Sequence, residues 1–175
     1  MVRHYTLEEE LARFYLAELV NILEYMHFEQ IAHRDLKPGN ILLNKDFHLV
    51  LCDFGTAQVM HPQILKRLPP KTRKQADSFQ SRSTFDEPCN ERQYSFVGTE
   101  EFVSPEVLLD KPSSYSTDFW SLGVILFQML VGRTPFKGDT QLITFENISK
   151  LKFEIPKKLS KNAGDLIKKL LVEDP

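Results

Sequence analysis

His33-Arg34-Asp35-Leu36-Lys37-Pro38-Gly39-Asn40 and, shortly after it, Asp53-Phe54-Gly55 are the most informative segments of this chain. Between them lie two apolar runs, Ile41-Leu42-Leu43 and Leu49-Val50-Leu51, separated by the polar Asn44-Lys45-Asp46. Short apolar runs joined by turn-forming residues predict the two strands of a β-hairpin. Two polar motifs therefore flank one short predicted hairpin.

The order and spacing of these two segments resemble the catalytic loop and the magnesium loop of eukaryotic protein kinases. Either segment alone is weak evidence, since a lone Asp-Phe-Gly is more often a plain turn. Phosphoryl transfer needs a base near the attacking hydroxyl, oxygen ligands for Mg²⁺ and positive charge beside the moving group. Asp35 suits the first task and Lys37 suits the third. Asn40 and Asp53 offer the oxygen atoms that a hard cation prefers.

The resemblance implies a role for each matching residue. Asp35 would accept or orient the proton of the substrate hydroxyl, and Lys37 would offset charge on the γ-phosphate of ATP. Asn40 and Asp53 would hold Mg²⁺. The implied ATP-binding set is Lys37, Gly39 beside the ribose, Asn40, Leu42 against the adenine ring, and Asp53.

Regulation and substrate binding are implied by further positions. Thr99 would link the substrate-binding loop to Asp35. Ser95 stands where the family carries its activating phosphate, and Arg34 is its expected partner because a guanidinium can meet phosphate oxygens in a bidentate way. The other implied positions are His33 and Phe54, which stack in a hydrophobic spine, Gly55, Glu106, and Asp118, which braces the catalytic loop.

Three longer segments narrow the resemblance to one branch of the family. Lys37, two residues after the aspartate, resembles the serine/threonine kinases. The segments that resemble the 3-phosphoinositide-dependent type within the AGC group are Asp53-Phe54-Gly55-Thr56-Ala57, Ser95-Phe96-Val97-Gly98-Thr99 and Phe102-Val103-Ser104-Pro105-Glu106. This resemblance implies transfer of the ATP γ-phosphoryl group to Ser or Thr hydroxyls of proteins, with other AGC kinases in phosphoinositide signalling as substrates.

Helical periodicity dominates the rest of the chain. Apolar residues recur at helical spacing through the first thirty residues, and Thr6-Leu7-Glu8-Glu9 fits a capping box, which predicts a long amphipathic helix. Residues 118 to 131 are apolar almost all round, which predicts a buried helix with Thr117 as its cap and Gly132 at its end. Further helices are predicted to open at Ser104-Pro105-Glu106 and to lie near residues 139–150 and 161–172.

The resemblance covers nearly the whole chain, so residues 1–175 are interpreted as a partial kinase domain. It implies a mainly α structure with a small β-hairpin, the large C-terminal lobe of the protein-kinase (α+β) fold. We expect the N-terminal lobe to be missing, since no glycine-rich loop or strand lysine precedes His33. The arginine that pairs with the glutamate at the position of Glu106 is also missing, so we expect Glu106 to be unpaired. The chain is thus interpreted as a fragment of a larger kinase.

Residues 61–94 differ in composition from the segments on either side. They carry several prolines among polar residues, their first part is basic, and no helical or strand period survives. We expect an extended activation-loop insertion of low order. A solvated insertion accounts for such a charge run. The alternative hypothesis is that the basic part contacts an acidic substrate segment or a lipid headgroup.

The overall composition excludes several classes of protein. A hydrophobic fraction of 42% with 26% charged residues is typical of a globular domain. The net charge of -2 gives no argument for nucleic-acid binding, and no apolar run is long enough to span a bilayer. We therefore expect a cytoplasmic protein that binds no nucleic acid and has no transmembrane segment, and that regions outside this chain could recruit to a membrane.

A second function from a different class remains open. The chain could be a non-catalytic lobe that docks substrates or sequesters partners, and the missing phosphate-binding lysine favours this alternative. The presence of Asp35, Asn40 and Asp53 favours an enzyme, because a kinase-like protein without activity often lacks one of these residue types.

Overall fold

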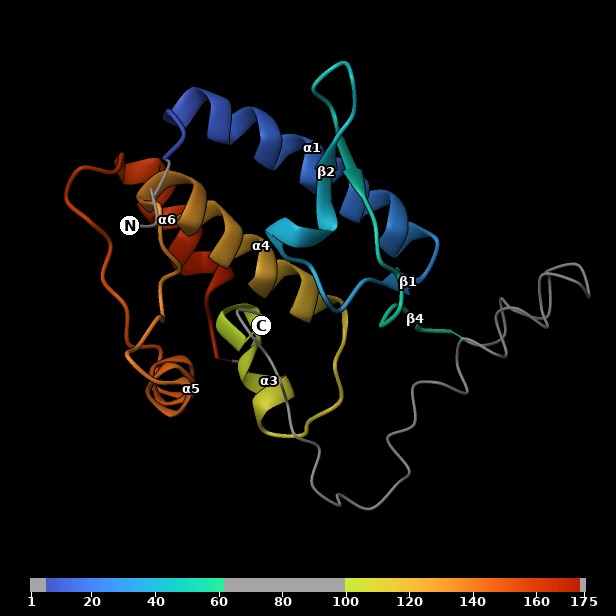
Figure 1. Ribbon diagram of the computed structural model, residues 1–175. Helices are drawn as coiled ribbons and strands as arrows, with labels where there is room; N and C mark the ends of the chain where they lie inside the picture. The colour runs from blue at the N-terminus through green and yellow to red at the C-terminus, as the bar shows by residue number, and fades with distance from the viewer. Residues whose placement is uncertain (1–5, 62–99, 174–175) are drawn as a thin grey trace, which may run out of the picture.

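We describe the fold from a computed structural model, which places residues 6–61 and 100–173 (Figure 1). Ser95, Thr99 and most of the predicted 61–94 insertion lie outside the described residues. The elements are α1 (Glu9–Phe28), β1 (Ile31–Ala32), η1 (Pro38–Asn40), β2 (Ile41–Leu43), β3 (Leu49–Leu51), β4 (Gln58–Val59), η3 (Glu100–Phe102), α3 (Pro105–Leu108), α4 (Tyr115–Val131), α5 (Gln141–Ser149) and α6 (Lys161–Leu170). The predicted fold class, mainly α with a small β-hairpin, is confirmed.

Helix α4 forms the centre of the described structure, and α1 and α6 both pack against it (Figure 1). Its side chains are buried on nearly all sides, as the apolar composition predicted. The contact with α6 is close. A Cβ atom added at Gly123 would lie 2.8 Å from Leu170 Cβ and 2.9 Å from Leu171 Cδ2. A larger residue at this position would therefore force the two helices apart.

The predicted start of α4 was wrong by three residues. The helix begins at Tyr115, and the hydroxyl of Ser114 caps it by accepting the backbone N–H of Ser116 at 3.2 Å. Serine is as good a cap as threonine, and Ser114 comes first along the chain. Thr117 lies inside the helix and is buried. The predicted end is confirmed, since Gly132 adopts a left-handed conformation with φ of 84°.

Helix α1 buries one stripe of side chains, and its start also differs from the prediction. It begins at Glu9, and no side chain caps its first turn, so the capping box at Thr6 does not form. Instead the backbone N–H of Leu7 donates to the carbonyl oxygen of Met129 at 2.7 Å, which ties the segment before α1 to α4. The buried stripe consists of Ala12, Leu16, Leu19, Leu23 and Met26.

The predicted hairpin is confirmed, with β2 antiparallel to β3 and Leu42 opposite Val50. A second two-stranded sheet was not predicted. In it β1 pairs antiparallel with β4, with Ile31 opposite Val59. Strands of two residues are too short to show a period in the sequence, so no pattern could reveal them.

The remaining predicted helices are confirmed with small shifts in their bounds. Helix α3 has Pro105 as its first residue. Helix α5 is capped by Thr140 and helix α6 by Ser160, and each hydroxyl accepts a backbone N–H of the first turn. Within residues 6–61 and 100–173, no helix has both the length and the apolar character needed to cross a bilayer.

Candidate active site

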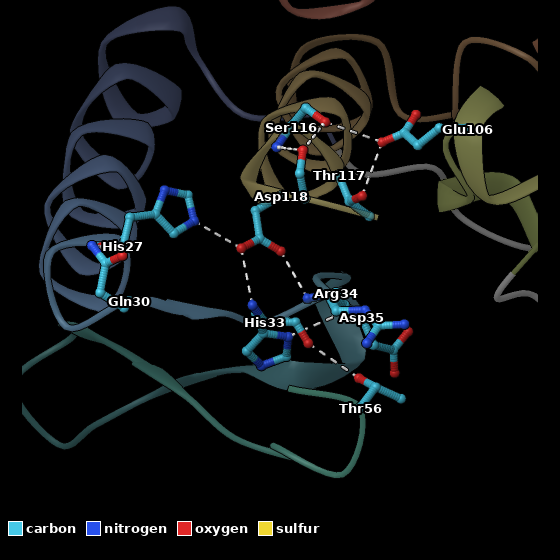
Figure 2. A network of polar contacts seen from close by, with 11 residues as sticks. His27, Gln30, His33, Arg34, Asp35, Thr56, Glu106, Ser116, Thr117 and Asp118 are labelled. Carbon is cyan, nitrogen blue, oxygen red and sulfur yellow. Dashed lines mark hydrogen bonds and ion pairs between the residues drawn. The ribbon is translucent and has the colours of Figure 1, made fainter. Parts of the chain in front are cut away.

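A buried carboxylate on α4 holds the backbone of the predicted catalytic loop. Asp118 is fully buried, and its Oδ1 accepts the backbone N–H of Arg34 at 2.8 Å (Figure 2). Its Oδ2 accepts the backbone N–H of His33 at 2.9 Å and lies 2.8 Å from Nε2 of His27 on α1. A buried charge is tolerated only when it is paired and hydrogen-bonded in this way. The loop is therefore fixed to the two central helices through one side chain.

Arg34 adopts a backbone conformation that requires such support. Its φ is 69°, in the left-handed region that a non-glycine residue enters only at a cost in free energy. Such conformations persist where the surrounding contacts over-determine them. The backbone N–H groups of His33 and Arg34 both donate to Asp118, and these two hydrogen bonds supply that constraint.

The side chains of Asp35, Lys37 and Asn40 come together at the end of this loop. Lys37 Nζ lies 2.8 Å from Asp35 Oδ2. Asn40 Nδ2 donates to the same oxygen at 3.1 Å and to the backbone carbonyl of Asp35 at 2.8 Å. Asn40 is buried, whereas Asp35 and Lys37 are half-buried. The amide of Asn40 thus orients the carboxylate of Asp35, and the ammonium group of Lys37 balances its charge.

The Asp53-Phe54-Gly55 segment follows the second strand of the hairpin, at the same open end as Asn40. The N–H of Cys52 donates to the carbonyl oxygen of Asn40 at 2.9 Å, which closes the open end of the hairpin. The rings of His33 and Phe54 lie 5.2 Å apart between centroids, a distance typical of packed rings. Asp53 is exposed, and its Oδ1 accepts the N–H of Gly55 at 3.3 Å.

Comparison with known proteins agrees with this geometry. The whole chain, residues 1–175, matches the family model described as "Protein kinase domain". The chain belongs to the protein kinase family. It is 42% identical over 167 residues to 3-phosphoinositide-dependent protein kinase 1 of Homo sapiens, a match that covers 95% of this chain and 26% of that protein.

Two more relatives are similar over almost the same region. The chain is 42% identical over 164 residues to the serine/threonine-protein kinase ksg1 of Schizosaccharomyces pombe, covering 94% of this chain and 26% of that protein. It is 38% identical over 169 residues to 3-phosphoinositide-dependent protein kinase 1 of Arabidopsis thaliana, covering 97% of this chain and 31% of that protein. The chain spans about a quarter to a third of the length of these relatives.

In this kinase chain, Asn40 and Asp53 fit the requirements of Mg²⁺. Asn40 donates to Asp35 through Nδ2, so its bonds to Asp35 do not use its Oδ1. Among the residues that the structure places, no group of three or more His, Cys, Asp or Glu side chains could hold a metal ion. Two oxygen donors from the protein suit Mg²⁺, because this ion usually completes its shell with phosphate oxygens and water.

Two of the residues implied to contact the nucleotide, Gly39 and Leu42, are exposed. Leu42 is 52% exposed, and a Cβ atom added at Gly39 would meet no atom within 4 Å. Phe54 is 43% exposed and lines an apolar hollow of about 510 Å³ between α1 and β3. Apolar surface is therefore available next to Asn40 and Asp53.

Arg34 and Glu106 each have a partner that the sequence analysis did not predict. The guanidinium of Arg34 donates to Gln58 Oε1 at 2.7 Å, and burial lowers its pKa while the charge of Asp118 opposes that shift. Glu106 is not unpaired, so that expectation was wrong. Its Oε1 accepts the hydroxyls of Thr117 at 2.9 Å and Ser116 at 3.3 Å (Figure 2). The first turn of α4 thus supplies hydroxyl groups to this carboxylate.

One residue of the site was missed by the sequence analysis. His27 lies at the end of α1, and its ring contacts Asp118 as well as the rings of Tyr115 and Phe119, whose centroids lie 4.6 Å and 5.2 Å away. No motif marks this histidine. Its contact with Asp118 depends on how α1 packs against α4, across a sequence separation of 91 residues.

Proposed function

We propose that this chain forms the catalytic lobe of a serine/threonine protein kinase, which transfers the γ-phosphoryl group of ATP to Ser or Thr hydroxyls of proteins. One observation carries the proposal. Asp35 Oδ2 is contacted by both Lys37 Nζ and Asn40 Nδ2, in a loop whose backbone is held by the buried Asp118. This arrangement keeps a carboxylate oriented beside a positive charge, which is what phosphoryl transfer requires of a protein.

In the proposed reaction the oxygen of the substrate hydroxyl forms a bond to the γ-phosphorus, and the bond between that phosphorus and the leaving oxygen of ADP breaks. Asp35 orients the hydroxyl and takes up its proton. Lys37, which already lies 2.8 Å from Asp35 Oδ2, offsets negative charge on the transferred group. Thr99 is proposed to link the substrate-binding loop to Asp35.

Asn40 and Asp53 are the residues proposed to hold Mg²⁺, which would neutralise phosphate charge when bound. Leu42 is proposed to pack on the adenine ring and the backbone at Gly39 to lie near the ribose. The exposure of Leu42 supports this assignment, since an exposed apolar side chain beside polar groups is suited to a flat aromatic ligand. The rest of the nucleotide site, including a lysine for the α- and β-phosphates, is proposed to come from outside residues 1–175.

The names of the relatives support a finer proposal on partners. Two of the relatives described above are named 3-phosphoinositide-dependent protein kinase 1, the type that the sequence segments resemble. From that resemblance we propose that the substrates here are other AGC kinases and that the protein acts in the cytoplasm. Ser95 is proposed as a phosphorylation site read by Arg34, and the basic part of residues 61–94 as a contact for an acidic peptide or lipid headgroup.

The test is transfer of labelled phosphate from ATP to a peptide copied from an AGC-kinase activation loop, using the protein that contains this chain. Asp35→Asn is expected to lower the rate by about 100-fold or more, since an amide cannot accept the proton. Asp165→Asn, which alters an exposed carboxylate on α6, is the control and should transfer at the parent rate. Near-parent transfer by Asp35→Asn would leave the docking or sequestering module as the better account.

A further inference from the structure

Glu18 on α1 contacts two successive residues of the β2–β3 hairpin. Its Oε1 pairs with Nδ1 of His48 in a short hydrogen bond. Its Oε2 accepts the backbone N–H of Leu49 at 2.8 Å. One carboxylate therefore joins the helix to both a side chain and the backbone of the hairpin. The side chain of Glu18 is 20% exposed and that of His48 is 58% exposed, so this contact lies at the surface.

The hairpin needs such a contact because it is short. Its strands have three residues each, and an isolated two-stranded hairpin is marginally stable in water. The turn itself is well defined, since Asn44 Oδ1 accepts the N–H groups of Asp46 at 2.8 Å and His48 at 3.0 Å. The turn therefore behaves as a unit, and Glu18 attaches that unit to α1.

The open end of the same hairpin carries the two proposed ligands of Mg²⁺. Asn40 immediately precedes β2, and Asp53 follows the end of β3 by two residues. The bond from the N–H of Cys52 to the carbonyl oxygen of Asn40 holds the two sides together. A shift of the hairpin relative to α1 would therefore move both proposed ligands.

We propose that Glu18 and His48 are positioning residues, which hold the β2–β3 hairpin on α1 and thereby fix the spacing of Asn40 and Asp53. We call this contact the hairpin clamp. Its structural part stands on the geometry above, and its effect on transfer rests on the proposed function. It requires no contact between either residue and the substrate.

The clamp is sensitive to the protonation of His48. The carboxylate of Glu18 raises the pKa of His48, and the nearby Asp46 in the turn adds to that effect, while partial burial opposes it. Bonds from His48 and from the N–H of Leu49 lower the pKa of Glu18. The charged groups facing His48 are thus Glu18 from α1 and Asp46 from the turn. The clamp is strongest while His48 is protonated and Glu18 is ionised, and it weakens as pH rises through the pKa of His48.

The test is amide hydrogen exchange of the 175-residue chain, followed by NMR from about pH 5.5 to 8.5 and corrected for the intrinsic rate at each pH. We expect the protection factors of the Leu49 and Cys52 amides to fall several-fold as pH rises. Glu18→Gln should lower both protection factors at the acid end of this range and make them less dependent on pH. Glu146→Gln removes an exposed pair between Glu146 on α5 and Lys150, the residue that follows this helix, and should change the protection of neither amide.

His48→Gln is the second variant, because His48 is more exposed than Glu18 and the change does not remove a buried group. It should flatten the pH dependence in the same way. Unchanged protection of the Leu49 amide in both variants would overturn the clamp. Lower protection of the Leu49 amide with unchanged protection of the Cys52 amide would overturn the positioning role.

A transfer assay separates this inference from the proposed function. In the protein that contains this chain, Glu18→Gln should lower transfer several-fold relative to Glu146→Gln. Equal transfer by these two variants would overturn the positioning role. If the parent itself transferred no phosphate, the proposed function would fail, while the exchange data would still decide whether the clamp holds the hairpin.

Discussion

Asp118 and Glu18 are both carboxylates that attach part of the candidate site to a helix, yet their surroundings differ. Asp118 is fully buried and accepts two backbone N–H groups of the catalytic loop while also contacting His27. Glu18 lies at the surface, where it accepts a hydrogen bond from one backbone N–H and pairs with the exposed imidazole of His48. Water competes for the contacts of Glu18 but not for those of Asp118. We therefore expect the contacts that hold the loop of Asp35 to be stronger than those that hold the hairpin between Asn40 and Asp53.

Removing the buried carboxylate should have the largest effect on stability. Asp118→Ala leaves the N–H groups of His33 and Arg34 without an acceptor in a buried place. We expect a loss of about 3–5 kcal/mol in the free energy of unfolding, the range found when one partner of a buried pair is deleted. Urea denaturation measures this change. Asp165→Asn on α6 is the matched surface control, and a change as small as that of the control would contradict the comparison.

A smaller loss in the free energy of unfolding is expected when only one partner of Asp118 is removed. His27→Leu keeps an apolar contact with Tyr115 and Phe119 but deletes the group that faces Asp118 Oδ2. That oxygen keeps the N–H of His33, so the expected cost is about 1–3 kcal/mol. The same denaturation experiment measures it. A cost equal to that of Asp118→Ala would mean that the imidazole, rather than the backbone bonds, holds the loop.

The smallest effect concerns pH and the hairpin clamp. The pKa of His48 is raised above its ordinary value of 6.5, so its contribution to stability is complete below that value and is lost as pH rises through the raised pKa. The pKa of Glu18 is lowered from 4.5, so its contribution is present above 4.5 and is lost as pH falls through the lowered pKa. The contribution of the pair is therefore greatest between these two ordinary values.

Thermal unfolding at several pH values checks this expectation. The difference in Tm between the parent and Glu18→Gln should be largest at mildly acidic pH and should shrink toward alkaline pH. A difference that stays constant from acidic to alkaline pH would show that the imidazole does not contribute.

The sequence revealed those parts of the site that are contiguous in the chain. Asp35, Lys37 and Asn40 fall within one loop, and Asp53 follows a hairpin whose strands and turn have a clear local pattern. The buried character of α4 was also predictable, because apolar residues lie on nearly all its faces. Such features depend on neighbours that lie close by in the sequence.

Contacts that depend on packing between distant segments were not predictable. The pair His27–Asp118 spans 91 residues and the pair Glu18–His48 spans 30, and each is a common pairing of residue types with no spacing rule. Glu106 was expected to be unpaired because only a charged partner was considered. The structure shows hydroxyl donors from Ser116 and Thr117 instead, which become available because α4 begins earlier than predicted.

The central claim is that Asp118 holds the loop proposed to perform transfer. The most direct measurement is phosphoryl transfer by Asp118→Asn in the protein that contains this chain. Asparagine offers one acceptor oxygen where Asp118 offers two. Its NH₂ group would face a backbone N–H, and two donors cannot form a hydrogen bond with each other. We predict a folded protein, checked by circular dichroism, whose transfer rate falls by about 100-fold because Asp35 is displaced. A folded Asp118→Asn protein that transfers phosphate at the parent rate would contradict the account.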